Sequence, residues 1–151
     1  MWRGLFGEIM KNYTFYDADG NVLRKPGKHV AFLDQATGLT WGSQLLDFEG
    51  NWAECLDAAK KTKLCGVRNW RAPTVEEQFA RMDRSRFAPA LNPILFPNMP
   101  SSGWLWTSSR DAEYPQDGAW YVGLGSGRAF RGYRDYQGRV LVVRSAPLPR
   151  Q

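Results

Sequence analysis

Glycine and proline interrupt this chain along its whole length, and they restrict it to short elements joined by turns. The 151 residues include 15 glycines and nine prolines, spread along the sequence. Four of the prolines fall within residues 89–100, and proline is excluded from helix interiors and central strands. The apolar fraction of 43%, with seven Trp, is too high for a disordered chain. We therefore expect one folded domain with a long, proline-rich loop.

Two short helices are predicted by their capping residues. Asn51 with Glu54 marks the start of a helix that runs to about Lys63, and Thr74 with Glu77 marks a second helix to about Met82. The spacing of apolar residues predicts which side chains each helix buries. These are Trp52, Cys55, Leu56 and Ala59 in the first helix, and Val75, Phe79 and Met82 in the second.

Short strands are predicted before and after these helices. Residues 12–24 read as a hairpin around Asp19-Gly20-Asn21, and residues 31–41 as two strands joined by a tight turn. Later strands are expected near 104–108, 119–124, 128–134 and 139–144, and the run VLVV at 140–143 is typical of a strand covered on both faces. Helices followed by hairpins make an α+β domain, with two helices packed on short, mostly antiparallel strands.

The first ten residues form a separate pattern. Their apolar residues recur at helical spacing, which predicts a short helix that must dock on its own domain, a sister subunit or a larger assembly. We expect an N-terminal arm and hairpin at 1–28, a main domain at 29–147 and a tail at 148–151. No signal peptide and no membrane span are recognisable, so we expect cytoplasmic synthesis without standard export.

The charge of the chain is concentrated near its end. From Ala119 onward there are six arginines, no lysine and one acid, Asp135, so the whole net charge of +5 lies in this part. Such asymmetry favours an anionic partner, although a solvated basic surface is the alternative.

The sequence provides no candidate catalytic residues. His29 is the only histidine, and no G-x-S-x-G segment is present. Cys55 and Cys65 would be about 15 Å apart along a helix, too far for a disulfide, so we expect two buried free thiols. The acidic turn after Asp17 fails as a calcium loop, since Lys28 occupies the position that requires glutamate. We expect no enzyme activity, no cofactor and no metal.

Several segments follow one another in a characteristic order: Asp34–Trp41, Trp52–Glu54, Asn69–Glu77, Pro89–Pro93, Phe96–Pro97, Trp106–Ser109, Ala119–Val122 and Val140–Arg144. This order resembles the C-terminal adhesive domain of bacterial collagen-like proteins. The resemblance spans about residues 30–145, and W-R-x-P-T within the third segment is its most specific part. The chain departs from the family at Ala72, where leucine is usual, and at Cys65, where a small residue is commoner.

This resemblance implies a C-type-lectin-like fold, which also occurs in phage proteins and in targets of diversity-generating retroelements. It implies a compact domain with two flanking helices and a long loop region that carries the ligand site. Trp70 and Trp106 would lie in the core, Thr74 would cap a helix, and Arg71 would be a paired anchor. The mammalian type of lectin calcium motif is absent.

The basic, aromatic stretch at 127–139 is the candidate ligand site. In a strand over 128–134, Arg128, Phe130 and Arg134 would point to one face, and Ala129, Arg131 and Tyr133 to the other. Arginine suits sulfate, phosphate and carboxylate, and aromatic rings suit sugars or bases. The predicted ligand contacts are Arg128, Arg131, Tyr133, Arg134 and Tyr136, then Trp120 and Tyr121, with Arg110, Asp111, Tyr114 and Asp117 in the adjoining loop.

These residues favour a non-enzymatic recognition module. We expect an adhesin or receptor-binding subunit that recognises an anionic glycan or a host surface receptor, on a phage particle or a cell surface. The family resemblance adds an expectation of trimers. Two alternatives stay open. The chain could be a structural virion subunit that uses the arginines and tyrosines of 127–139 as a protein interface, or a protein that binds single-stranded nucleic acid.

Overall fold

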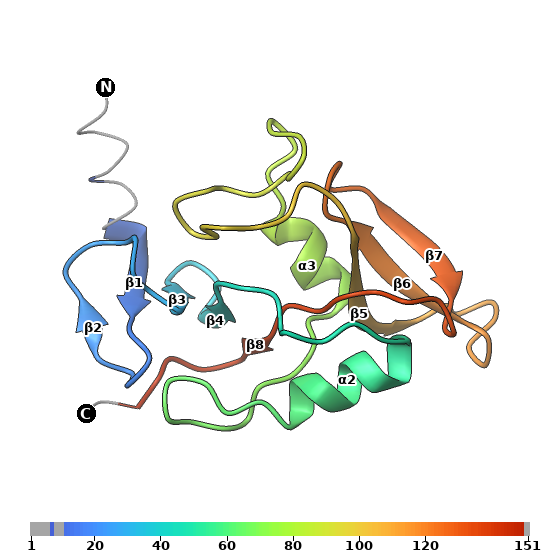
Figure 1. The fold of residues 1–151 in the computed structure, drawn as a ribbon, viewed down its shortest axis with the longest axis horizontal. Helices are drawn as coiled ribbons and strands as arrows, with labels where there is room; N and C mark the ends of the chain where they lie inside the picture. Colours follow the sequence, from blue (N-terminus) through green and yellow to red (C-terminus); the bar gives the residue numbers. More distant parts are fainter. Residues whose placement is uncertain (1–6, 8–10, 150–151) are drawn as a thin grey trace.

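A five-stranded antiparallel sheet forms one end of the molecule (Figure 1). The computed structural model describes residues 7 and 11–149. The strands lie in the order β2-β1-β3-β4-β8. Their bounds are Tyr13–Tyr16 for β1, Val22–Leu23 for β2, Ala31–Asp34 for β3, Leu39–Gly42 for β4 and Val143–Arg144 for β8.

A three-stranded antiparallel sheet forms the other end (Figure 1). It contains β5 (Trp104–Arg110), β6 (Gly118–Gly123) and β7 (Ala129–Tyr133), in that order. The segment 124–128 connects β6 to β7. Since β7 is the last strand of this sheet, its outer edge pairs with no strand among the described residues.

Both predicted helices are present, and each begins at its predicted cap. In α2 (Trp52–Lys60), Asn51 caps the helix and Glu54 completes the capping box, and Thr74 and Glu77 do the same for α3 (Val75–Arg81). The helix α3 contacts β5 and β6 and is tied to β3 by the ion pair between Arg81 and Asp34, at 3.0 Å. It therefore bridges the two sheets. The domain is α+β, with two helices and two antiparallel sheets.

The core consists of two adjoining clusters. One joins Phe15, Phe32 and Trp41 of the larger sheet to the proline-rich loop and to β5 and β6. The other gathers five buried tryptophan and cysteine side chains around α2 with the C-terminal segment: Trp52, Cys55, Cys65, Trp70 and Trp106. Cys55 and Cys65 are free and buried, as predicted. Burial raises the pKa of each thiol to about 11, so both are poor nucleophiles at neutral pH.

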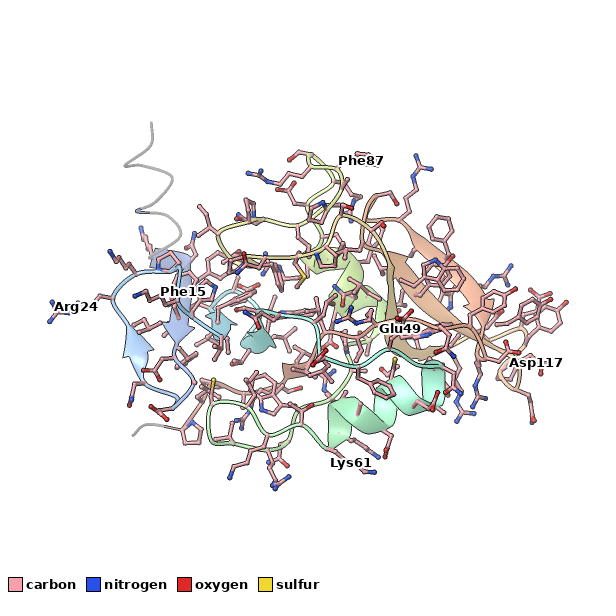
Figure 2. The ribbon with its side chains drawn as sticks, viewed as in Figure 1. Phe15, Arg24, Glu49, Lys61, Phe87 and Asp117 are labelled. Carbon is pink, nitrogen blue, oxygen red and sulfur yellow. The ribbon has the colours of Figure 1, made fainter. Side chains whose placement is uncertain are left out.

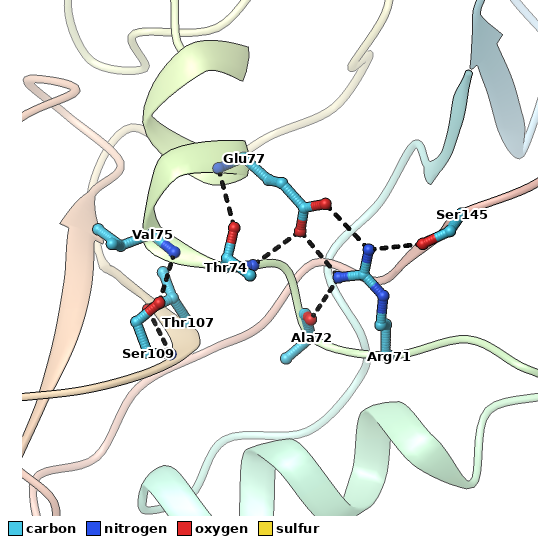
Figure 3. Close-up of polar contacts among 8 residues, drawn as sticks. All are labelled: Arg71, Ala72, Thr74, Val75, Glu77, Thr107, Ser109 and Ser145. Atoms are coloured by element: carbon cyan, nitrogen blue, oxygen red, sulfur yellow. Dashed lines mark hydrogen bonds and ion pairs between the residues drawn. The ribbon is translucent and has the colours of Figure 1, made fainter. Parts of the chain in front are cut away.

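The W-R-x-P-T segment joins α3 to the C-terminal strand (Figure 3). The Arg71 guanidinium donates to both carboxylate oxygens of Glu77, at 2.8 and 2.9 Å, and to the Ser145 hydroxyl at 2.8 Å. Glu77 also accepts from the backbone N–H of Thr74. The hydrogen bonds from Arg71 lower the pKa of Glu77. Trp70 and Trp106 are fully buried, so these two residues, Thr74 and Arg71 have the structural roles that the family resemblance implies.

The structure corrects three details of the sequence prediction. Phe79 is 40% exposed, because Gln78 takes the buried position of the helix. The guanidinium of Arg84 lies over the Phe79 ring at 3.9 Å. Residues 140–143 are buried, but only Val143 lies in a strand, β8. The preceding residues cross between the two sheets. The carbonyl of Val142 accepts from Gly42 of β4, and the backbone of Arg139 donates to Trp104 and accepts from Trp106 of β5. The helix from Asn51 ends at Lys60, three residues before its predicted end.

The predicted division after residue 28 falls between two strands of one sheet. The hairpin of β1 and β2 is present, and β1 pairs with β3 over its whole length. The predicted apolar helix at 1–10 lies outside the described residues, Gly7 excepted. His29 lies just after the hairpin, where its ring accepts from the N–H of Gly27 and hydrogen-bonds the carbonyl of Leu95. It is a buried structural residue, and burial lowers its pKa.

Candidate functional site

A cleft of about 590 Å³ lies at the β6–β7 end of the smaller sheet, near the loop that carries Asp117 (Figure 2). Its size is within the range of small-molecule sites, roughly 300–1,000 Å³. Five aromatic side chains line it: Trp104, Tyr114, Tyr121, Tyr133 and Tyr136. Three charged residues, Asp111, Asp117 and Arg131, and two glycines, Gly118 and Gly132, complete the lining.

Four of these aromatic rings contact one another in a continuous series. Trp104 and Tyr121 are stacked, with ring centroids 3.9 Å apart and planes within 8°. Tyr136 lies 5.3 Å from Trp104, and Tyr133 meets Tyr136 edge to face at 5.4 Å. Tyr133 and Tyr136 are 61% and 42% exposed. Such rings offer a ligand large apolar faces together with hydroxyl groups.

Two glycines leave the room that the cleft requires. A side chain at Gly132 would place its Cβ 2.9 Å from the Tyr121 ring, so the stacked rings lie directly over this point of β7. A Cβ at Gly118 would lie 3.2 Å from a carboxylate oxygen of Asp111. In the sheet register Gly118 pairs with Tyr133, so Asp111 and Tyr133 border the same part of the cleft. Any larger residue at either glycine would crowd the cleft.

The charged groups of the cleft are coupled to one another. Arg131 donates to Glu113 at 3.0 Å and lies 3.5 Å from Asp111 Oδ1. The hydrogen bond to Glu113 is the main reason that the pKa of Arg131 is raised, with Asp111 second. Asp111 is nearly buried, with 8% of its side chain exposed, and the N–H of Glu113 donates to its Oδ1. The guanidinium is therefore already paired with two carboxylates of the protein.

Arg134 supports the cleft from outside. Its guanidinium donates to the carbonyls of Pro115 and Gln116, at 3.3 and 3.1 Å, and lies over the Trp52 ring at 4.3 Å. The indole N–H of Trp52 in turn donates to Thr107 on β5. The start of α2 is thus connected to the loop at 111–117, which carries Tyr114 and Asp117.

The structure brings together seven of the eleven residues predicted for the site. Tyr114, Tyr121, Arg131, Tyr133 and Tyr136 line the cleft, and so do the loop acids Asp111 and Asp117. The other four predicted residues, Arg128, Arg134, Trp120 and Arg110, are not in the lining.

The four predicted residues outside the cleft have other positions. Trp120 pairs with Arg131 in the register and Tyr121 with Phe130, so Trp120 lies on the opposite face of β6 from Tyr121. Arg110 lies over Trp52, beside Arg134. Arg128 is exposed just before β7. The register also confirms that Phe130 and Arg131 point to opposite faces.

Sequence reasoning missed Trp104 and Glu113. Trp104 is two residues before the core residue Trp106, so both belong to the same face of β5, and this alternation was the available signal. Glu113 has no such signal, because its bond to Arg131 joins residues 18 apart through the fold.

A family model described as the Lcl C-terminal domain matches residues 31–144. The chain belongs to this family. The finding confirms the resemblance that the sequence motifs indicate. No curated protein matches the chain.

The part of the chain that matches the Lcl C-terminal domain holds the whole cleft. It runs from β3 to β8 and includes both helices and every lining residue. Within the described residues, no group of three His, Cys, Asp or Glu side chains could hold a metal ion. No helix in that same part is long and apolar enough to cross a membrane.

Proposed function

We propose that this chain is a C-type-lectin-like, non-enzymatic recognition module that binds a sugar of a surface glycan in the aromatic cleft. The observation that carries the proposal is the convergence of five aromatic side chains on a cleft of about 590 Å³. Membership of an adhesive family supports a binding role, and the position of the cleft within the family region supports its use as the ligand site.

The chemistry of the lining suits a sugar ring. The exposed faces of Tyr133 and Tyr136 can pack against the apolar side of a ring. Carboxylates such as Asp117 can accept hydrogen bonds from sugar hydroxyls, and tyrosine hydroxyls can both donate and accept. A mostly apolar cleft with a few polar groups is the usual form of a small-molecule site.

The contacts of the arginines favour the aromatic cleft over Arg128, Arg131 and Arg134 as the main determinant of binding. Arg131 is paired with Asp111 and Glu113, and Arg134 holds loop carbonyls. An anionic glycan is the second candidate ligand, and the exposed Arg128 favours it.

A glycan array with four forms of the protein tests the proposal. Tyr136→Ala removes an exposed ring of the cleft, and Phe87→Ala is its matched control, because Phe87 is 80% exposed on a separate loop (Figure 2). We expect the wild type to bind a defined set of glycans, Tyr136→Ala to bind them about tenfold more weakly, and Phe87→Ala to bind as the wild type does.

The fourth form, Arg128→Ser, separates the two candidate ligands. Unchanged binding by this variant supports the cleft. Loss of binding in Arg128→Ser with full binding in Tyr136→Ala would contradict the cleft and favour an anionic glycan held by the arginines.

We further propose that the module acts in an assembly, as a trimer or as a subunit of a phage particle or cell-surface adhesin, with residues 1–10 as the docking segment. Multivalency would offset weak single sites. Deleting residues 1–10 should lower the mass measured by light scattering. An unchanged mass with unchanged thermal stability would contradict the docking role.

A further inference from the structure

We infer that the cleft prefers a sugar that carries a free, positively charged amine; this inference rests on the proposed function. Acidic groups outnumber basic ones in the lining of the cleft. Among the described residues, Asp111 and Asp117 contribute two carboxylates to the lining and Arg131 contributes one guanidinium, which Glu113 holds from outside the lining. The charge of the lining is therefore opposite in sign to the net charge of the chain, +5.

Arg131 does not supply a free positive charge. It donates to Glu113 at 3.0 Å and faces Asp111 at 3.5 Å, so two carboxylates already compensate it. Arg134, which lies beside the same loop, points its guanidinium to the carbonyls of Pro115 and Gln116 and to Trp52. An anion entering the cleft would therefore meet carboxylates without an unpaired guanidinium to bind it.

Asp111 provides a specific position for the amine. Only 8% of its side chain is exposed, and its Oδ1 takes both hydrogen bonds that the described residues make to this carboxylate. Its Oδ2 accepts none from the described residues, lies close to Gly118 and is not fully buried, so a ligand in the cleft can reach it. A carboxylate oxygen that no protein donor occupies can accept from a ligand, and an ammonium group has three donors.

The aromatic lining strengthens the same preference. The faces of Trp and Tyr rings carry negative electrostatic potential, which attracts an ammonium group. Tyr133 pairs with Gly118 in the register, so this ring and Asp111 border the same part of the cleft. The volume of about 590 Å³ exceeds what an isolated ammonium head group needs and accommodates a sugar ring beside it.

Calorimetric titration of the full chain with matched oligosaccharides tests the inference. The probes are a glucosamine trisaccharide, its fully N-acetylated form, the neutral glucose trisaccharide of the same linkage, and choline. We expect the free amine to bind about tenfold more tightly than the acetylated form, since one charge-assisted hydrogen bond distinguishes them. Choline should bind more weakly than the amino sugar, because it offers no sugar ring and no N–H donor.

Three variants locate the preference. Asp111→Asn should reduce the ratio of amine to acetylated affinity to about one, with Glu76→Gln, an exposed acid of α3, as the control that leaves the ratio unchanged. Asp117→Asn, at the exposed rim, should lower the ratio a few-fold and serves if Asp111→Asn fails to fold.

The outcomes separate the inference from the proposed function. Equal or tighter binding of the acetylated or neutral sugar would overturn the amine preference and leave the cleft as a sugar site. Binding of choline above all sugars would overturn the amino-sugar assignment. Absence of binding to all four probes would also overturn it, while the glycan array decides the proposed function independently.

Discussion

Arg131 and Arg134 are three residues apart, yet they have different tasks in the fold. Arg131 pairs with acids in the loop before β6, and Arg134 holds the carbonyls of that loop. The sequence predicts that both lie near the loop at 111–117, and it predicts the tyrosines of the cleft. It could not predict that both guanidinium groups are occupied, because their partners are 18 to 20 residues away along the chain.

Glu77 makes the stability of the domain sensitive to acid. Because Arg71 lowers the pKa of Glu77 below its ordinary value of 4.5, the unfolded chain binds the proton more readily than the folded one. The stabilisation that the Arg71–Glu77 pair contributes is fully present above about pH 4.5, and it is lost as the pH falls through the pKa of Glu77 in the folded chain. Glu77→Gln should cost about 1 kcal/mol of unfolding free energy at neutral pH.

Chemical denaturation between pH 3 and 7 measures this effect. The loss of stability below about pH 4.5 should be shallower in Glu77→Gln than in the wild type, whereas the exposed neighbour Glu76→Gln should follow the wild type. Identical slopes for Glu77→Gln and the wild type would show that the Arg71–Glu77 pair does not carry this dependence.

At the scale of elements, the capping boxes decide where both helices begin, and these local signals are readable from the sequence. The segment 140–143 shows where local reading fails. Its apolar run indicates burial on both sides, which is correct. Its hydrogen bonds depend on two different sheets, and no local pattern encodes that crossing.

The loop at 111–117 depends on Arg134 for its position. Arg134→Ala removes two hydrogen bonds to this loop and the contact with Trp52, so the loop should open more often. We expect a stability loss of about 1–2 kcal/mol, faster amide hydrogen exchange at 112–117 and weaker ligand binding.

Arg128→Ala is the matched control for this change, since Arg128 is exposed outside the cleft. It should leave stability and loop exchange near the wild-type values. If Arg134→Ala also leaves hydrogen exchange in the loop unchanged, the loop does not depend on this arginine.

At the scale of the whole molecule, overall charge and local charge point to different ligands. The net charge of +5 favours polyanions in general, while the cleft itself is acidic and aromatic. The two modes differ in their response to salt, because polyanion binding releases counterions and a short-range contact in a cleft does not.

Titrations at 50 and 200 mM salt distinguish these modes. Binding of heparin or single-stranded DNA should weaken about tenfold or more over this range, while binding of a neutral or singly charged glycan in the cleft should change less than about twofold. Steep salt dependence for the cleft ligand would indicate that it is held by the general surface charge.

The indole N–H resonances of the tryptophans test the central claim most directly, because one of these side chains, Trp104, lines the cleft while Trp70 lies in the core. A two-dimensional NMR titration with the best glycan from the array would follow both. The account predicts a progressive shift of the Trp104 indole signal with the Trp70 signal unmoved, and in Tyr136→Ala the same shift at about tenfold higher glycan concentration. Saturable binding that leaves Trp104 unmoved would contradict the assignment of the aromatic cleft as the ligand site.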